Sequence, residues 1–521
     1  MSPPIRNTII RNTLYSILGR TWTIAVNIVL VPYIISKIGI DRFGIWALLS
    51  ILVGYFALLD FGIGVSFTRF ITEAFTKGDG DEINRIVNSG FVFYLLLALP
   101  VSLIAFFARG PIFSLLNIDP IAYPDAVTAY YGTLVIFLLS TALSGFSSVL
   151  LGLQRIALVN KIAIVVTIPN VVGTVVLLRS GLKLDGLMWT SLISSVSGLL
   201  ITFLYAKRNL ASLRFNPFLF SSKTVKRLLG FGLKIQFAKF SDLITFQADK
   251  TIVSYFSGIT VVGFYQIGSQ IVWRIRDLPL LLLSSLLPAA SELHTLNDRK
   301  KLLEMYARGT KYLAVVSIPL MFFLAATAHM IMRAWVGPGY DMSANISQIL
   351  IAGYLCNVLV GVGAAAAAGM NQPDFQWHSA IVTTVANLVL VVILGYFFGI
   401  YGIAVASTLS LIVGPAYFLV KFHGHIQVPL RAFASSIMIS PFLISLAGCS
   451  VLWVANTLFF GSANYGGRLP YLIILSVEAV IFAGTYGWGI LRNRYFDEVD
   501  RELFVNNYLL TKVQKLVRFS S

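Results

Sequence analysis

Long apolar runs, each about the length needed to cross a bilayer, recur along the whole chain. A transmembrane helix needs about 20 mostly apolar residues, and runs of this kind extend from Thr13 to Leu491 with short polar segments between them. This pattern predicts fourteen membrane spans. They are residues 13–36, 43–68, 86–108, 126–152, 161–180, 186–205, 229–256, 261–287, 309–332, 345–369, 378–398, 401–420, 432–456 and 470–491. We therefore predict an all-α polytopic membrane protein.

The composition and the placement of charge agree with this fold class. Only 12% of the 521 residues are charged, about half the fraction of a soluble domain. The 39 basic residues exceed the 22 acidic ones, but most Lys and Arg fall in alternate polar segments, as the positive-inside rule requires. The pattern predicts cytoplasmic termini, no nucleic-acid partner, and some attraction to anionic membrane lipids. Cys356 and Cys449 lie in apolar runs and indicate no disulfide framework and no metal site.

The two halves of the chain repeat short motifs at nearly one spacing. The pairs are Gly39-x4-Gly44 with Gly258-x4-Gly263, Gly152-Leu153-Gln154 with Gly369-Met370-Asn371, Asn170 with Asn387, and Gly186 and Ser191 with Gly402 and Ser407. Such a duplication predicts two pseudo-symmetric six-helix bundles of the same orientation with a central site. The predicted domains are an N-terminal bundle at 1–205, a basic cytoplasmic linker at 206–228, a C-terminal bundle at 229–420, and two extra transmembrane helices with a cytoplasmic tail at 421–521.

Spans seven and eight carry many charges for membrane segments. A charge at the bilayer centre costs at least about 2.5–3.5 kcal/mol, so such residues normally face a watery cavity or a partner. The charged residues are Lys234, Lys239, Asp242, Asp249, Lys250, Arg274, Arg276 and Asp277. They indicate a polar path through the membrane and transport of something charged.

Several motifs resemble those of a known superfamily. They are Val31-Pro32-Tyr33 to Ile45-Trp46, Leu58-Leu59-Asp60-Phe61-Gly62-Ile63-Gly64 before Arg69, Asp249-Lys250 followed by Gly263-Phe264-Tyr265, and Leu287-Pro288. The chain resembles the multidrug/oligosaccharidyl-lipid/polysaccharide flippase superfamily, in its polysaccharide-synthesis, O-antigen-flippase-type branch. The resemblance implies movement of an undecaprenyl-diphosphate-linked oligosaccharide from the cytoplasmic to the outer leaflet of the inner or plasma membrane. The product would be a surface polysaccharide, with membrane lipids and polysaccharide assembly proteins as partners.

The charges of span seven allow two interpretations. At 100° per residue, Lys234, Lys239, Asp242 and Asp249 fall within one half of the helix circumference. They form either an internal ladder of ion pairs, in which Lys239 and Asp242 pair at i,i+3, or a cavity wall whose lysines attract the lipid diphosphate.

The polar residues of span eight suit recognition of a phosphorylated sugar. Gln270, Trp273 and Asp277 share one face, and Arg274 lies at its edge. The planar guanidinium of Arg274 can grip two oxygens of a diphosphate together. Trp273 either stacks on a sugar ring or packs within the protein, and Arg276 points away and is predicted to pair with another helix.

Arg20 in span one and Asp60 in span two are predicted at matching depths, roughly 10–12 Å inside the cytoplasmic boundary. Their salt bridge would be either a structural pair or a proton-sensitive gate. The predicted substrate-binding residues are Lys234, Lys239, Arg274, Trp273 and Gln270. The predicted ion-coupling or gating residues are Arg20, Asp60, Asp242, Asp249 and Asp277.

Two other functions stay open at this stage: a membrane polysaccharide polymerase or ligase, and a cation-coupled multidrug or metabolite antiporter of the same superfamily. The short predicted outer loops leave little room for a catalytic domain. Span one has Arg20 and Asn27 but no carboxylate, unlike the drug exporters of the superfamily. No nucleotide-binding GxxxxGK[ST] motif occurs. We expect a transporter that works by alternating access, not an enzyme, with no metal and no cofactor.

Overall fold

The computed structural model is helical throughout the residues that it describes. These are residues 3–210, 212–280, 283, 286–460, 467–498 and 500, and the side chains of 3–18, 20, 233–235, 237–239, 459 and 460 lie outside the description. Every regular element in this part of the chain is a helix, so the predicted fold class is confirmed. Helices suit a bilayer because they satisfy their backbone hydrogen bonds within one segment.

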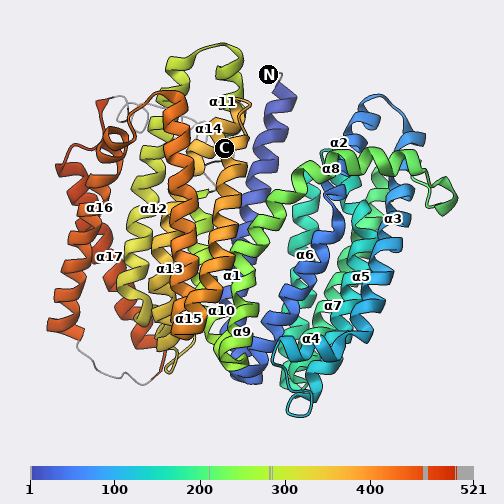
Figure 1. Ribbon diagram of the computed structural model, residues 1–521, viewed down its shortest axis with the longest axis horizontal. Helices are drawn as coiled ribbons and strands as arrows, with labels where there is room; N and C mark the ends of the chain where they lie inside the picture. Colours follow the sequence, from blue (N-terminus) through green and yellow to red (C-terminus); the bar gives the residue numbers. More distant parts are fainter. Residues whose placement is uncertain are drawn as a thin grey trace, which may run out of the picture. The chain divides into compact units, whose positions relative to one another are not determined.

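The helices follow one another with short connections (Figure 1). Their bounds are α1 Pro3–Ala57, η1 Leu58–Asp60, α2 Ile63–Thr76, α3 Gly80–Phe107, α4 Arg109–Leu115, α5 Pro124–Gly152, α6 Ile156–Arg179, α7 Lys183–Asn209, η2 Pro217–Leu219, α8 Ser222–Leu243, η3 Ile244–Ala248, α9 Asp249–Ser257, α10 Ile259–Leu280, α11 Leu286–Thr295, α12 Arg299–Trp335, α13 Asp341–Leu359, α14 Gly361–Gly369, α15 Asp374–Ile426, α16 Leu430–Ala455, η5 Asn456–Phe460 and α17 Leu469–Arg492. Among the described residues, ten helical stretches are long and apolar enough to cross a membrane. The chain is therefore a multi-pass integral membrane protein.

Two of these stretches each contain a pair of predicted spans. Helix α1 bends at Gly39, which has φ 80° and ψ 168°, and helix α15 bends at Gly399, which has φ 57°. Only glycine adopts such a left-handed backbone without steric cost. The sequence predicted connections at 37–42 and 399–400, whereas the structure turns each pair of spans at a single glycine.

Residues that are equivalent in the predicted duplication have the same backbone conformation. Gly258 has φ 84° and ψ 172°, close to the values of Gly39. Gln154 and Asn371 both have φ 58°, although this region disfavours side chains. The motifs that indicate the duplication therefore mark equivalent turns.

A helix cap that the sequence analysis did not use repeats at the same spacing. Asp79 caps α3 by accepting a hydrogen bond from the backbone N–H of Glu82. Asp298 caps α12 in the same way, with the backbone N–H of Lys301 as donor. A short acidic side chain at this position satisfies one of the free N–H groups of a helix start. The repeated cap supports the duplication independently.

The chain packs into two compact units, each with its own core. The first consists of Met1–Arg274, Pro338–Gly353 and Trp377–Gly414, and the second of Ile275–Gly337, Tyr354–Gln376 and Pro415–Ser521. The first core includes Ile63, Phe67, Ile71, Tyr94 and Phe146, and the second includes Tyr306, Leu313, Phe418, Phe422 and Phe433. These units follow from packing and do not test the predicted domain boundaries.

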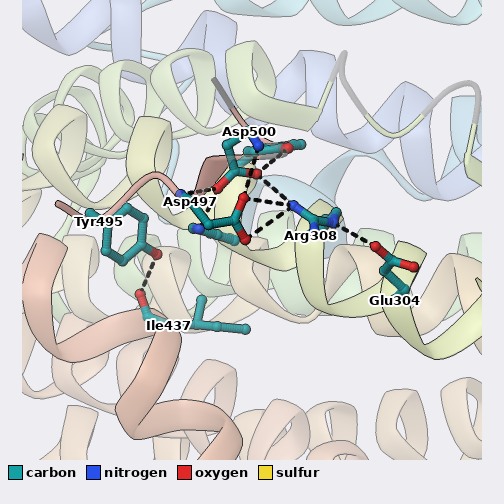
Figure 2. A network of polar contacts seen from close by, with 8 residues as sticks. Glu304, Arg308, Ile437, Tyr495, Asp497 and Asp500 are labelled. Atoms are coloured by element: carbon teal, nitrogen blue, oxygen red, sulfur yellow. Dashed lines mark hydrogen bonds and ion pairs between the residues drawn. The ribbon is translucent and has the colours of Figure 1, made fainter. Parts of the chain in front are cut away.

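A polar network fixes the segment after the last helix of the second unit to α12 (Figure 2). The fully buried carboxylate of Asp500 accepts hydrogen bonds from Arg308 Nη1 at 2.8 Å, Lys311 Nζ at 2.5 Å and Tyr312 Oη at 2.6 Å. Burial raises the pKa of Asp500, but the bonds from Lys311 and Tyr312 outweigh it and lower the pKa to about 2. The Asp500 charge therefore holds this segment in place.

Replacing Asp500 by Asn should lower the free energy of unfolding by about 3 kcal/mol, the lower end of the range for a broken buried ion pair, because Arg308 and Lys311 stay partly exposed. The folded-state pKa is depressed, so the stabilisation is complete above the unfolded pKa of about 3.9 and is lost as the pH falls toward about 2. The difference in melting temperature between the two proteins should therefore shrink below pH 4. The control is Asp497→Asn, which removes a carboxylate that is 53% exposed and should cost less than about 1 kcal/mol. Equal losses in the free energy of unfolding for the two variants would contradict the conclusion that Asp500 holds this segment in place.

Candidate functional site

The predicted cationic span seven lies in the first unit as three consecutive helical segments. Lys234, Lys239 and Asp242 are residues of α8, the π-helix η3 follows, and Asp249 begins α9. The side chains of Lys234 and Lys239 lie outside the described residues. Asp242 is exposed, whereas Asp249 is only 4% exposed and Lys250 only 2%.

The π-helix explains why the predicted continuous face is divided. Each π turn holds an extra residue compared with an α-helix, so the rotation of 100° per residue does not carry through Ile244–Ala248. Asp249 is therefore rotated away from the position that a continuous α-helix would give it relative to Asp242, and the charged wall stays a prediction. Single π turns occur often at functional sites.

Asp249 is the centre of a buried polar cluster. Its Oδ2 accepts a hydrogen bond from the hydroxyl of Tyr265 on α10, and its Oδ1 accepts one from the backbone N–H of Lys250 at 2.8 Å. The Nζ of Lys250 donates to Gln247 Oε1 at 2.6 Å. A buried charge must be hydrogen-bonded in this way because water cannot solvate it. From the sequence, Tyr265 is noted only as part of a motif of the family resemblance, so its role as the partner of Asp249 was missed.

Two further contacts fix the middle of this span. Ser241 Oγ lies 2.7 Å from Thr384 Oγ1 on α15, and Phe246 stacks on Trp273 of α10 with ring centroids 6.1 Å apart. Of the two interpretations of Trp273, the packing one therefore describes its ring in this structure. Thr384 was not predicted, because the sequence does not show which face of α15 meets α8.

The two other predicted substrate-binding residues, Gln270 and Arg274, lie on α10 and are half-buried. Within the described residues, the Arg274 guanidinium makes no ion pair or hydrogen bond, in contrast to its neighbour Arg276. In the second unit, Arg276 donates to Asn357 Oδ1 on α13 at 3.0 Å and lies 3.8 Å from Asp277. The predicted pairing of Arg276 with another helix is confirmed, and Asp277 is 39% exposed beside it.

Asp60 lies in a break of the second predicted span. It ends the 3₁₀ turn η1, after which Phe61 and Gly62 adopt left-handed conformations. Its Oδ1 accepts hydrogen bonds from Tyr94 Oη at 2.5 Å and from the backbone N–H of Gly64 at 3.1 Å. The predicted partner, Arg20, has its side chain outside the described residues, so the salt bridge stays a prediction. Tyr94 is a partner that the sequence analysis missed.

The duplicated glycine motifs meet each other in the first unit. A Cβ on Gly44 would overlap the carbonyl oxygen of Ile259, and a Cβ on Gly263 would come within 2.6 Å of the carbonyl oxygen of Ile40. The contact is reciprocal. Gly44 packs against Ile259, the residue after the bend at Gly258, and Gly263 packs against Ile40, the residue after the bend at Gly39. The second span thus approaches the eighth to backbone contact, with the side chains of Ile40 and Ile259 packed on the two glycines.

A second close contact joins the turn before α2 and the start of α2 to α8. A Cβ on Gly232 would come within 2.6 Å of the carbonyl oxygen of Phe61, and Ser66 Oγ donates to the carbonyl oxygen of Leu228 at 2.8 Å. Gly62 meets Gly232 in the same contact. The second predicted span therefore touches the spans of the duplicated half at two separate levels.

The sequence matches the family described as polysaccharide biosynthesis protein over residues 9–294. Two relatives are a probable low-salt glycan biosynthesis flippase of Haloferax volcanii, 24% identical over 75% of this chain and 79% of the relative, and a putative O-antigen transporter of Shigella flexneri, 20% identical over 78% of this chain and 96% of the relative. A solved structure of the lipid II flippase MurJ in an inward closed conformation has the same fold, with a TM-score of 0.70 and 15% identity, and the match covers 93% of this chain and 99% of that one.

Replacing Tyr265 by Phe should lower the free energy of unfolding by about 1–3 kcal/mol, because the buried carboxylate of Asp249 loses a donor. Tyr255→Phe on α9 is the control, since Tyr255 is 60% exposed. Melting temperatures in detergent measure both variants. In the Asp249→Asn background the Tyr265→Phe change should cost less, and strictly additive losses would show that the two side chains are not coupled.

Proposed function

The chain belongs to the family of polysaccharide biosynthesis proteins, and we propose that it is a flippase for a lipid-linked oligosaccharide. The cargo moves from the cytoplasmic to the outer leaflet of the cell membrane, for assembly of a surface polysaccharide. The names of the two relatives, a glycan biosynthesis flippase and an O-antigen transporter, support this activity. In this proposal the carrier lipid is an undecaprenyl diphosphate, both termini are cytoplasmic, and polysaccharide assembly proteins receive the product.

One observation supports a negatively charged cargo most directly. Arg274 is a permanent cation in predicted span eight, it is half-buried, and no described residue pairs with it. A charge in such a position is costly unless it faces water or meets an anion. A diphosphate fits because its oxygens can accept two parallel hydrogen bonds from one guanidinium. Lys234 and Lys239 are proposed as further cations of the same path, and Gln270 as a polar contact to the sugar.

The carboxylates have a different proposed role. Asp60 and Asp249 are each held by a tyrosine hydroxyl, and Asp60 lies where the second span breaks. Protonation or release of such a carboxylate changes which helices it connects, so we assign Asp60, Asp242, Asp249, Asp277 and the predicted partner Arg20 to gating or ion coupling. Alternating access then requires that the two glycine contacts of the second span open one at a time.

Replacing Lys234, Lys239 or Arg274 by Ala should lower export by about ten-fold or more while protein level and membrane insertion stay normal. The reason is that a hydrogen bond to a charged group contributes about 1.5–3 kcal/mol. Arg274→Lys should restore only part of the activity, because the bidentate grip is lost. The measurement is surface polysaccharide in a deletion strain that carries each variant, with protein quantified in the membrane fraction.

The matched controls are Arg431→Ala and Lys421→Ala, which remove exposed cations of the second unit. Both should export as the parent does. Full export by all three Ala variants, at Lys234, Lys239 and Arg274, would contradict the proposed cationic path. Normal export with shortened polysaccharide chains would instead indicate a polymerase, and ion-driven dye efflux would indicate an antiporter.

A disulfide between cysteines placed at Ile40 and Ile259 should stop transport. Both residues lie in the reciprocal glycine contact, which is predicted to be on the outer face, so the cross-link holds that face closed. The background is simple, since the chain has only Cys356 and Cys449, which can be replaced first. Reduction should restore export in the same cells. If the oxidised and reduced proteins export equally, separation of these helices is not part of the mechanism.

A further inference from the structure

An apolar cavity of about 290 Å³ lies between α5 and α7 in the first unit. Its lining is entirely hydrophobic and includes Leu143 and Phe146 of α5, Val196, Leu200 and Phe203 of α7, and Phe215 of the connection to α8. Val196 is 36%, Phe215 47% and Leu200 57% exposed, so the cavity opens at the surface. At 1.5 Å per residue, Val196 and Phe203 lie roughly 20 and 9 Å from the end of α7 at Asn209. This depth lies within one leaflet of the bilayer, which is about 20–22 Å thick with its head groups.

Aromatic rings form one wall of this cavity. The rings of Phe146 and Phe203 lie 5.0 Å apart between centroids, and those of Phe146 and Phe215 lie 6.0 Å apart. Phe91 of α3 packs edge-on against Phe215 at 4.6 Å. These contacts fix Phe215 although it belongs to a connection and not to a helix.

Two asparagines of α3 hold the same connection in an extended form. Asn84 donates to the carbonyl oxygen of Ser212 at 2.8 Å and accepts from the N–H of Arg214 at 2.7 Å. Asn88, one helical turn later, donates to the carbonyl oxygen of Arg214 and accepts from the N–H of Asn216. Four hydrogen bonds therefore fix the backbone on both sides of Phe215, and the site exists before any ligand arrives.

Cations lie beside the end of the cavity that is predicted to be cytoplasmic. Lys207 follows Phe203 by four residues and Leu200 by seven, so it lies on the same face of α7, one turn beyond the cavity. Arg214 directly precedes Phe215, and both basic side chains are exposed. Neither forms an ion pair with any residue in the described part of the chain. An apolar cavity with unpaired cations at its polar end matches a lipid with an anionic head group.

We propose that this cavity binds one acyl chain of an anionic phospholipid of the cytoplasmic leaflet, with the head group at Lys207 and Arg214. The stretch from Val196 to Phe203 is roughly 10 Å long, shorter than the hydrocarbon of one leaflet at about 15 Å. That length fits part of one acyl chain and leaves most of a long polyprenyl chain outside. The site is separate from the residues assigned to the cargo, and the inference does not depend on the proposed transport activity.

Native mass spectrometry of the full-length protein tests this site with two probes of equal chain length, phosphatidylglycerol and phosphatidylcholine. One phosphatidylglycerol should bind with clear preference over phosphatidylcholine. Lys207→Gln should weaken phosphatidylglycerol binding by about five-fold, the effect of one cation near a membrane surface, and leave phosphatidylcholine unchanged. The double change with Arg214→Gln should weaken phosphatidylglycerol binding further. The control Lys421→Gln removes an exposed lysine of the second unit and should have no effect.

A second variant tests the cavity itself. Leu143→Trp should fill it and lower the binding of both lipids, whereas Leu204→Trp, on an α7 side chain that is 63% exposed, should change nothing. Equal phosphatidylglycerol binding by the parent, Lys207→Gln and Leu143→Trp would overturn the proposal. So would displacement of phosphatidylglycerol by a polyprenyl phosphate with the same dependence on Lys207 and Leu143, because the carrier lipid would then be the occupant. Neither outcome involves a transport measurement, so the proposed flippase activity stands or falls separately.

Discussion

The cost of an unsatisfied polar group in hydrocarbon is the constraint on which the rest of the structure depends. It accounts for the all-helical chain, because only a helix satisfies its backbone within one membrane segment. It also accounts for how the carboxylates are held: Asp60 and Asp249 each meet a tyrosine hydroxyl and a backbone N–H. Asp500, in the segment after the last helix, shows the same rule with two cations and a tyrosine.

The sequence predicted the features that depend on local pattern and missed those that depend on packing. Spans follow from hydrophobic length, and the duplication follows from glycine motifs whose conformations agree, as at Gly39 and Gly258. The division of span seven was missed because a rotation of 100° per residue assumes an α-helix, and the π turn before Asp249 breaks that assumption. Tyr94 and Tyr265 were missed for a different reason: their partners are distant in sequence, and an isolated tyrosine in an apolar run gives no sign of its contact.

The glycine contacts join the predicted repeat to the proposed movement. Where two helices touch through side chains, opening the contact exposes interlocked apolar surfaces. Where Gly44 meets Ile259 and Gly263 meets Ile40, each glycine packs against backbone and one isoleucine side chain, so little side-chain interlocking has to be undone. The same holds where Gly62 meets Gly232. Because both contacts involve the second span, a change in its break at Asp60 can strengthen one contact while it weakens the other, which is the coupling that alternating access needs.

The distribution of paired and unpaired charges separates structural residues from those proposed to meet a ligand. Asp249, Arg276 and Asp500 have their partners within the protein, so their hydrogen-bonding capacity is largely used. Among the described residues, Arg274 has no partner although it lies in predicted span eight, and Lys207 has none at the predicted edge of the bilayer. A charge without a partner among the described residues is open to a group from outside the protein. In our two proposals, that group is an anionic cargo for Arg274 and the head group of a bound lipid for Lys207.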